Sequence, residues 1–480
     1  MHSIHAGPPA VPSSDQPRPP RVGVMGHFGD SNLGDEAIIE AFVTRLRREW
    51  PAVELRIFSM HPGDSRRRYR CESHALRLAT EFEEEFRPLI DFMESWHAAG
   101  EGSAAGAVAP AAAEDGRPPR HPALARCVDW LDRVVPRGRL RSTAASVVRT
   151  VAGAARELAF LRRSFGRVRG LDVMFVTGSN QFLDNFGGPW GFPYTLLKWT
   201  LMCRLRGCRV AFVSVGAGPL DRRASHWMVA RAIGLSDYVS FRDEGSRRLI
   251  LEATGHDGVV LPDLAHSLHA HPDPALAASS RGPEATGALR IAINAMPVHD
   301  PRYWHRPDPV KYERYVAALS TVCRGLASRG HDITFFATQF PDANVAVDVA
   351  RATASAPVAP WPVAVPMTVQ ELLGVLRGAD IVVATRFHGI LLSLLMERPT
   401  VGICYYRKSR ELLAEAGLAA YAFDIDDFDA AALEAAVVRM IEERRAVVGT
   451  VASRSAAYRE ALERQYVQLF DLVRRRLAAS

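Results

Sequence analysis

The 480-residue sequence lacks any long, uncharged apolar run of the kind that crosses a membrane. Such a helix needs about 20 predominantly apolar residues, and the nearest candidate, Ala352–Gln370, is interrupted by four prolines. Residues 1–20 also lack the apolar core of a signal peptide and are rich in proline and polar residues. We therefore expect a disordered N-terminal tail over residues 1–20 and a cytoplasmic protein.

Cysteine is scarce, with six residues scattered through the chain and no CxxC pair. The two closest, Cys203 and Cys208, have no following Cys or His pair at the spacing of zinc ligands. We therefore expect free thiols in a reducing compartment and no metal site.

Acidic residues are nearly absent from the segment Arg117–Arg169. Its 13 arginines and three carboxylates give it a net charge of +10, so the rest of the chain carries −4. A protein that coats nucleic acid is basic over a broader surface, and the segment has few aromatic residues for stacking on bases. We expect no nucleic-acid partner, but one surface that meets an anion.

Part of this segment has the pattern of a basic amphipathic helix. Arg149, Arg156 and Arg163 fall opposite an apolar stripe that consists of Val147, Val151, Ala154, Leu158 and Leu161. We favour the interpretation that the stripe packs on its own domain, within a basic helical insertion at about residues 94–168. The alternative is peripheral contact of Arg117–Arg169 with anionic lipid at the inner membrane face.

Short apolar strands alternate with amphipathic helices in two successive series, over residues 21–270 and 288–429. Residues 271–287, rich in Pro, Ala, Ser and Gly, are the expected linker, and residues 430–480 are expected to form C-terminal helices. This alternation predicts an α/β protein with two parallel sheets and a cleft between two domains. Ligands of such sheets bind at the carboxyl ends of the strands, so the loops there are the candidate site.

The first such loop, Gly26–Asp35, joins a strand at Arg21–Met25 to a helix at Glu36–Arg48. Its three glycines allow close approach of a ligand, and the helix amino terminus attracts an anion. The loop matches no nucleotide-binding fingerprint. We expect Asp35 to cap the helix while the loop lines a site.

Three further strand ends carry weaker signals. Small and polar residues follow at Thr177–Gln181, with Asp184 close behind, and at Val215–Pro219. Arg242 ends a strand in Ser240–Glu244, where the alternative interpretation is a surface ion pair of little energetic value with Asp243 or Glu244.

The most informative loop is Thr385–Gly389, which follows the buried strand Ile381–Ala384. Arg386 and His388 alternate with Phe387, so in an extended segment both would face the same side. A guanidinium binds a carboxylate or phosphate with two hydrogen bonds, and a histidine can act as an acid or base near neutral pH. Tyr405–Lys408 adds basic groups at another strand end. These residues predict an anion-binding cleft without naming a reaction.

Together the loops resemble those of the polysaccharide pyruvyl transferase family. Arg386-Phe387-His388, with Pro399, Tyr405 and Lys408 in step, is the most specific part of the resemblance. The matching segments are Gly29–Ile38, Val239–Leu249, Glu371–Leu373 and Ala379–Leu418.

The resemblance implies a GT-B-like fold, with two Rossmann-like domains that face each other across a cleft. It implies transfer of the pyruvyl group of phosphoenolpyruvate onto two hydroxyls of a sugar, forming a cyclic ketal in cell-surface glycan biosynthesis. The acceptor would be a sugar, a glycan or a lipid-linked sugar, and no cofactor is expected. The implied catalytic residues are His388, as the acid, and Asp35 or Asp184, as the base. The implied substrate-binding residues are Arg386, Arg242, Asn32 and Lys408.

Two other functions share this architecture: a glycosyltransferase that uses a nucleotide sugar, and a non-catalytic glycan-binding protein. The presence of both Arg386 and His388 argues against a non-catalytic protein.

The chain departs from the family pattern in two places. Thr177–Asn180 has fewer glycines than the family usually has there, and the insertion at about residues 94–168 is longer. Both departures bear on the choice of acceptor.

Overall fold

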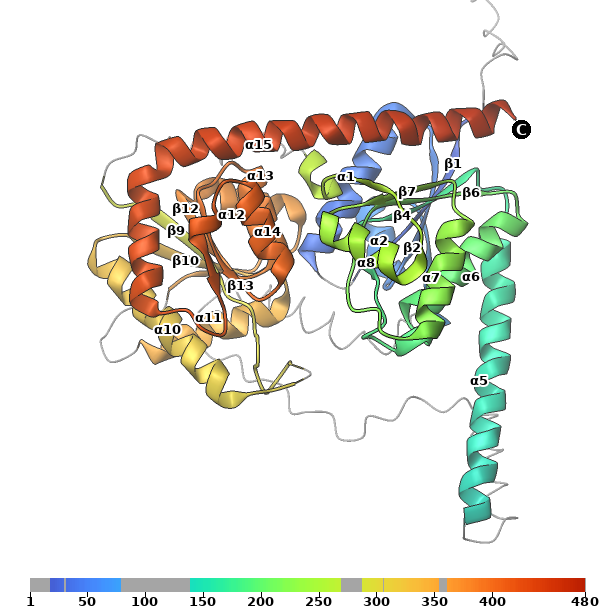
Figure 1. Ribbon diagram of the computed structural model, residues 1–480, viewed down its shortest axis with the longest axis horizontal. Helices are drawn as coiled ribbons and strands as arrows, with labels where there is room; N and C mark the ends of the chain where they lie inside the picture. The colour runs from blue at the N-terminus through green and yellow to red at the C-terminus, as the bar shows by residue number, and fades with distance from the viewer. Residues whose placement is uncertain are drawn as a thin grey trace, which may run out of the picture.

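The computed structural model describes residues 18–29, 32–78, 139–268, 287–304, 306–353 and 361–479. Within them the chain forms two parallel sheets, each flanked by helices, as two Rossmann-like domains (Figure 1). This confirms the predicted fold class. Residues 1–17 of the expected tail, much of the insertion and nearly all of the expected linker lie outside the described residues.

The first sheet has the strand order β3-β2-β1-β4-β6-β7-β8, with β5 paired to β6 and all pairs parallel. The chain reverses direction across the sheet between β1 and β4, and such a switch point opens a crevice at the strand ends. The strands are β1 (Arg21–Met25), β2 (Glu54–Ser59), β3 (Glu72–Ala75), β4 (Val173–Thr177), β5 (Asn180–Phe182), β6 (Arg209–Ala217), β7 (Tyr238–Phe241) and β8 (Val259–Val260). The helices are α1 (Leu33–Glu49), α2 (Pro62–Tyr69), α5 (Arg139–Arg167), η3 (Gly188–Trp190), α6 (Phe192–Leu205), α7 (Arg223–Gly234), α8 (Glu244–Thr254) and η4 (Leu264–Ser267).

The second sheet has the order β11-β10-β9-β12-β13-β14, again with all pairs parallel, and its switch point lies between β9 and β12. Its strands are β9 (Arg290–Asn294), β10 (Asp332–Phe336), β11 (Val363–Ala364), β12 (Ile381–Ala384), β13 (Thr400–Cys404) and β14 (Ala422–Asp424). Its helices are α10 (Pro309–Ser328), α11 (Phe340–Ala352), α12 (Val369–Gly378), α13 (Phe387–Leu395), α14 (Arg407–Glu415) and η5 (Ala419–Tyr421).

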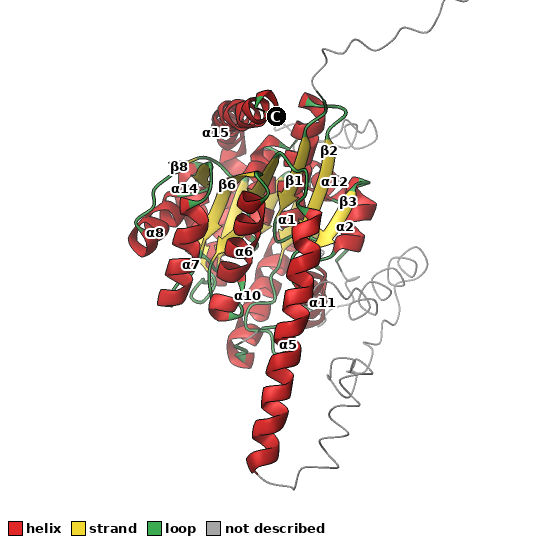
Figure 2. Ribbon diagram, turned by 90° about the vertical axis from the view of Figure 1, so that its right-hand side faces the viewer, coloured by secondary structure: helices red, strands yellow, loops and turns green. Residues whose placement is uncertain are grey.

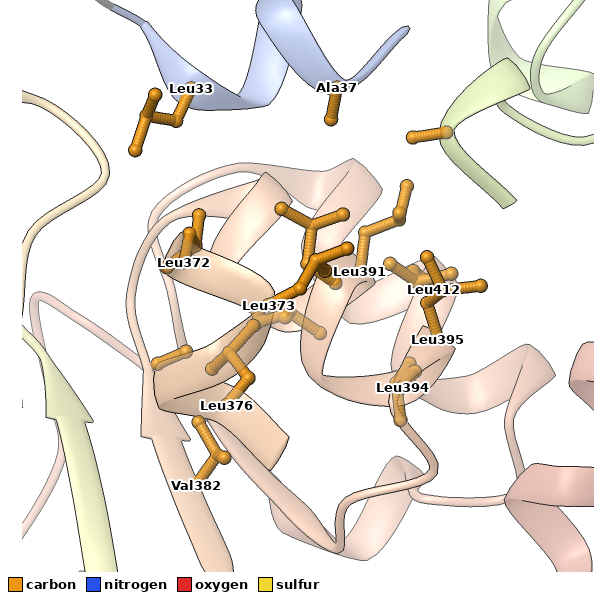
Figure 3. Packing of buried hydrophobic residues seen from close by; sticks show 14 of the residues in the cluster. Leu33, Ala37, Leu372, Leu373, Leu376, Val382, Leu391, Leu394, Leu395 and Leu412 are labelled. Carbon is orange, nitrogen blue, oxygen red and sulfur yellow. The ribbon is translucent and has the colours of Figure 1, made fainter. Parts of the chain in front are cut away.

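One apolar core extends across both domains. Leu33 and Ala37 of α1 face the leucines of α12 and α13 in the second domain (Figure 3). The backbone N–H of Leu33 also donates a hydrogen bond to the carbonyl oxygen of Thr338, at 3.1 Å. The first turn of α1 is therefore held directly against the second domain, which brings the two switch points together.

The C-terminal residues form a single helix, α15 (Ala430–Ala478), which runs along both domains (Figure 1). Its last turns return to the first domain, where the Tyr466 hydroxyl lies 2.8 Å from Ser267 Oγ and Gln465 Nε2 donates to Ser240 Oγ at 2.7 Å. Phe470 packs edge-on against Trp50, with ring centroids 4.9 Å apart. The helix therefore ties the second domain to the first.

The predicted basic helix is present as α5, which extends away from the first domain (Figure 1). Its packed side differs from the prediction: Phe160 and Ser164 are buried, whereas Leu158 is 69% exposed. The reason is that Phe160 packs edge-on against Trp199 of α6, and Glu157 pairs with Lys198 at 2.9 Å. The expectation that the stripe containing Leu158 covers its own domain is therefore wrong for that residue.

None of the helices in the described ranges combines the length and the hydropathy that crossing a bilayer requires.

Candidate functional site

A cavity of about 860 Å³ lies where the strand ends of the two domains meet. Its walls come from loops after β1, β4, β6 and β7 of the first domain and after β9, β10, β12 and β13 of the second. Six of the seven predicted site residues line it: Asn32, Asp35, Arg242, Arg386, His388 and Lys408.

Asp184 is the predicted site residue that the structure does not place in this cavity. Its carboxylate accepts the backbone N–H groups of Asp221, at 3.3 Å, and Arg222, at 3.0 Å. Burial alone would raise the pKa of Asp184, but the nearby Ser225 and these amides lower it. The side chain anchors the chain just before α7, which leaves Asp35 as the predicted carboxylate that faces the cavity.

The first loop begins α1 earlier than predicted, at Leu33, and Asn32 rather than Asp35 caps the helix. Asn32 Oδ1 accepts the backbone N–H of Gly34 at 3.1 Å, and its Nδ2 donates to Asp35 Oδ2 at 2.6 Å. Asp35 therefore lies in the first turn, with Oδ2 3.9 Å from His27 Nδ1. Burial would raise the pKa of Asp35, but the nearby side chains of His27, His388 and Lys408 outweigh burial and lower it overall. Asp35 is thus an ionised carboxylate at the cavity wall.

Glu36, the next residue, secures the loop from behind. Its carboxylate accepts the Gly29 N–H at 2.6 Å and the Tyr69 hydroxyl at 2.7 Å. Burial raises the pKa of Glu36 to about 7. The turn that carries Asn32 and Asp35 is therefore held by an internal hydrogen-bond network.

Arg386 and His388 both reach the cavity, but not through the extended segment that was predicted. Helix α13 starts at Phe387, so Arg386 is its extended N-cap residue and His388 belongs to its first turn. Arg386 Nε and Nη2 donate to Asp342 Oδ1 at 2.9 and 2.6 Å, and its backbone N–H donates to Asn294 Oδ1 at 3.0 Å. The fully buried Asp342 thus fixes the guanidinium on the second domain.

The ring of His388 lies directly against the first domain. A Cβ placed on Gly34 would be 2.1 Å from His388 Nδ1, so only glycine permits this approach. His388 Nε2 is buried without a hydrogen-bond partner, 4.0 Å from Asp263 Oδ2. Burial lowers the pKa of His388 to about 4, although Asp263 and Asp35 oppose the shift. The imidazole is therefore neutral at neutral pH.

Arg242 is 7% exposed, so the ion pair with Asp243 considered above is present, with Nε 3.5 Å from Oδ2, but the guanidinium is buried rather than on the surface. Its Nη2 donates to Asn180 Oδ1, and its Nη1 lies 3.5 Å from Asp263 Oδ2. The guanidinium carbon also lies 5.1 Å from the ring centroid of Phe387, a residue of the other domain. Arg242 is thus a buried cation that bridges the two domains at the cavity.

Lys408 lies in the first turn of α14. Its Nζ is 4.5 Å from the ring centroid of Phe387 and 5.2 Å from that of Tyr406. Burial, followed by the charge of Arg242, lowers the pKa of Lys408 to about 7, against the opposing effect of Asp35, Asp263 and Asp243. The cavity therefore contains an amine that titrates near neutrality.

Sequence reasoning missed two buried carboxylates that organise the site. Asp263 contacts both Arg242 and His388, and Asp342 holds Arg386. Asp263 follows β8, and Asp342 lies in the first turn of the helix after β10. The strand-end argument that selected Arg386 would have selected both if it had been applied to these strands.

In the part of the chain that the structure describes, no group of three or more His, Cys, Asp or Glu side chains is arranged to hold a metal ion. The five cysteines described there are free thiols.

Two Rossmann-like domains with a cationic cavity between their strand ends define a GT-B-like protein. Among solved structures, the UDP-GlcNAc 2-epimerase from Methanocaldococcus jannaschii is 10% identical, with a TM-score of 0.50, over 88% of this chain and 94% of that one. The S. aureus MnaA–UDP co-structure is 9% identical, with a TM-score of 0.50, over 93% and 95% of the two chains. At such low identity these similarities establish the fold alone.

A family model described as polysaccharide pyruvyl transferase matches residues 32–406. The chain belongs to this family, as the loops after β1 and β12 indicated. A comparison with curated protein sequences found no match.

Proposed function

We propose that this protein transfers the pyruvyl group of phosphoenolpyruvate onto two hydroxyls of a sugar, forming a cyclic ketal during glycan biosynthesis. The observation that supports this most is one cavity in which Arg242, Arg386 and Lys408 lie with the ionised carboxylate of Asp35. Phosphoenolpyruvate carries both a carboxylate and a phosphate, so its binding needs at least two cationic anchors.

The chemistry matches these groups. Protonation of the methylene carbon C3 gives an oxocarbenium-like centre at C2, which a sugar hydroxyl attacks. The phosphate then leaves, and the second hydroxyl closes the ketal ring. Asp35 is the base that accepts a hydroxyl proton, and Arg242 and Arg386 stabilise the charge on the carboxylate and the departing phosphate. Phosphoenolpyruvate is the donor and the reaction involves no net oxidation or reduction, so the proposal includes no resident redox cofactor.

The test is to incubate the purified protein with phosphoenolpyruvate and a panel of free, nucleotide-linked and lipid-linked sugars. We expect phosphate release that depends on one acceptor class, with a matching gain of one pyruvyl ketal in the mass of the acceptor. A parallel panel of nucleotide sugars is the control. Nucleotide release without consumption of phosphoenolpyruvate would overturn the proposal in favour of a glycosyltransferase. Sugar binding without turnover of either donor would favour a non-catalytic glycan-binding protein.

We also propose that the face formed by α5, α6 and α7 rests against an anionic membrane surface. These helices cover the same side of the first domain (Figure 2). Neither α6 nor α7 contains a carboxylate, and the Glu157 carboxylate of α5 is paired with Lys198. Leu158, Leu205 and Trp227 are 69%, 75% and 62% exposed on these helices. Exposed apolar side chains on helices that also carry several arginines are typical of helices that bind anionic lipid.

Changing Arg149, Arg156 and Arg163 together to glutamine should weaken sedimentation with anionic vesicles. Each basic residue near such a surface contributes about 1 kcal/mol, and salt screens the attraction over about 8–10 Å. Binding of the unchanged protein should therefore fall as salt rises and should be absent with neutral vesicles. The matched control changes Arg324, Arg351 and Arg445, which lie on other helices, and should leave sedimentation unaffected. If the unchanged protein stays in the supernatant at low salt, α5 is a structural insertion only.

A further inference from the structure

The proposed reaction needs a proton donor for the methylene carbon C3 of phosphoenolpyruvate. The cavity contains four neutral or cationic groups that could supply one: His27, His388, Tyr406 and Lys408. The resemblance to the family implies His388. The following inference rests on the proposed function and concerns which of these groups gives the proton.

The geometry of His388 does not suit this role. One ring nitrogen, Nδ1, lies against the first turn of α1 at Gly34. The other, Nε2, is buried and lies 4.0 Å from Asp263 Oδ2. Asp263 itself is 4% exposed and is not among the residues that line this cavity. A proton on Nε2 would therefore be directed toward Asp263 rather than toward a bound substrate.

His27 and Tyr406 are also unsuited to donate this proton. His27 Nδ1 is 3.9 Å from Asp35 Oδ2, and its ring packs edge-on against Phe192. It therefore supports Asp35 in the role of the base. Tyr406 is 45% exposed as a whole residue, but partial burial raises the pKa of its hydroxyl above the usual value, which makes the phenol a weaker acid.

We propose that Lys408 is the general acid that protonates C3 of phosphoenolpyruvate. Its ammonium group faces the cavity from the first turn of α14 and rests on the rings of Phe387 and Tyr406. Aromatic faces stabilise a cation without accepting its protons. Within the described residues Lys408 forms neither an ion pair nor a hydrogen bond, so its N–H groups remain available to a substrate.

The charges around Lys408 keep this amine close to its titration point. Arg242 disfavours the ammonium form, whereas Asp35, Asp263 and Asp243 favour it. Arg407 and Glu411 of the same helix line the same cavity, and the neutral His388 faces it from α13. The resulting pKa of about 7 is well matched to general acid catalysis near neutral pH.

Lys408 first gives a proton to C3 and regains one at the end of the reaction. The Nζ–H bond of Lys408 breaks and leaves its electron pair on nitrogen, while the C2–C3 π pair forms the new C3–H bond. A sugar oxygen bonds to C2, and Asp35 takes the hydroxyl proton. The C2–O bond to phosphate breaks with its electron pair on oxygen, and the phosphate receives the proton held by Asp35. The second hydroxyl then bonds to C2, and its proton restores the ammonium group of Lys408.

The decisive variant is Lys408→Arg, compared with Lys408→Ala. Arginine keeps the positive charge, so the affinity for phosphoenolpyruvate should stay within a few-fold of the unchanged protein. Its guanidinium is too weak an acid to give up a proton, so kcat should fall by about 100-fold or more. Lys408→Ala should lose affinity as well, and added methylammonium or ethylammonium should restore part of its rate in a saturable manner. If Lys408 is only an anion clamp, Lys408→Arg will recover kcat, and the inference is then wrong.

The pH dependence gives a second readout that a merely structural role would not change. In the unchanged protein kcat/KM should fall as the pH rises through about 7, since the protonated donor is lost. The remaining activity of Lys408→Arg should lack this decline, although Glu36, whose pKa is also about 7, is still present in it. A decline that persists in Lys408→Arg would assign it to another group and overturn the inference. If the unchanged protein releases no phosphate from phosphoenolpyruvate with any acceptor, it is the proposed function that fails.

Discussion

Replacing Arg386 by alanine should lower kcat/KM for pyruvyl transfer by roughly two to three orders of magnitude, equivalent to about 2–4 kcal/mol of transition-state stabilisation. Arg386 Nε and Nη2 are held by Asp342 Oδ1, so the guanidinium has a fixed orientation at the cavity wall before any substrate binds. A fixed cation stabilises developing charge without reorganisation during the reaction. Steady-state measurement of phosphate release, with phosphoenolpyruvate varied, measures this loss.

The alanine variant also removes the partner of a buried carboxylate, because Asp342 is 2% exposed. Breaking a buried ion pair destabilises a protein by leaving an unpaired charge, so thermal unfolding must be measured beside activity. The matched variant is Arg386→Lys, which keeps a positive charge beside Asp342 but loses the planar fork of donors. We expect Arg386→Lys to be folded yet still clearly impaired. A folded alanine variant with near-normal kcat/KM would show that Arg386 does not belong to the reactive site.

The features that sequence could predict are those encoded over a few consecutive residues. The strand Ile381–Ala384 has the same bounds in the structure, and Arg386 and His388, which follow it, line the cavity as expected. The same rule placed Asn32, Asp35 and Arg242 there. Parallel strands end at one edge of a sheet, so polar residues that follow buried strands converge whatever the detailed packing.

The rule fails where the tertiary environment decides how a polar group is used. Asp184 follows a strand as well, but the nearest donors are the backbone amides before α7, and its carboxylate is occupied by them. For α5 the pattern predicted a helix correctly but not its buried side, because that depends on Trp199 and Lys198 of a neighbouring helix. Contacts between the two domains, such as that of Asp263 with His388, join residues too far apart in sequence for any local pattern to reveal.

The contact between Gly34 and His388 is the clearest example, and Gly34→Ala should strongly impair the protein. The new Cβ would lie 2.1 Å from His388 Nδ1 and 2.5 Å from His388 Cβ, so the ring cannot turn away without moving its own backbone. We expect kcat/KM to fall by about 100-fold, because the clash separates Asp35 from the residues of the second domain that it faces. We expect the free energy of unfolding to fall by about 1–3 kcal/mol, as in other overpacked sites.

A double-mutant cycle with His388→Ala tests the cause directly. Removing the imidazole should relieve the contacts with Nδ1 and Cγ but not the contact with the Cβ of residue 388, so Gly34→Ala should destabilise the His388→Ala protein less than it destabilises the unchanged protein. Gly449→Ala in α15 is the matched control, since a Cβ there meets no atom within 4 Å. Helix propensity alone makes that change neutral or stabilising by up to about 1 kcal/mol, and the same would hold for Gly34 if its surroundings were open. Equal effects of the two glycine substitutions on stability and on activity would therefore show that the close approach of His388 to α1 is not required for the reaction.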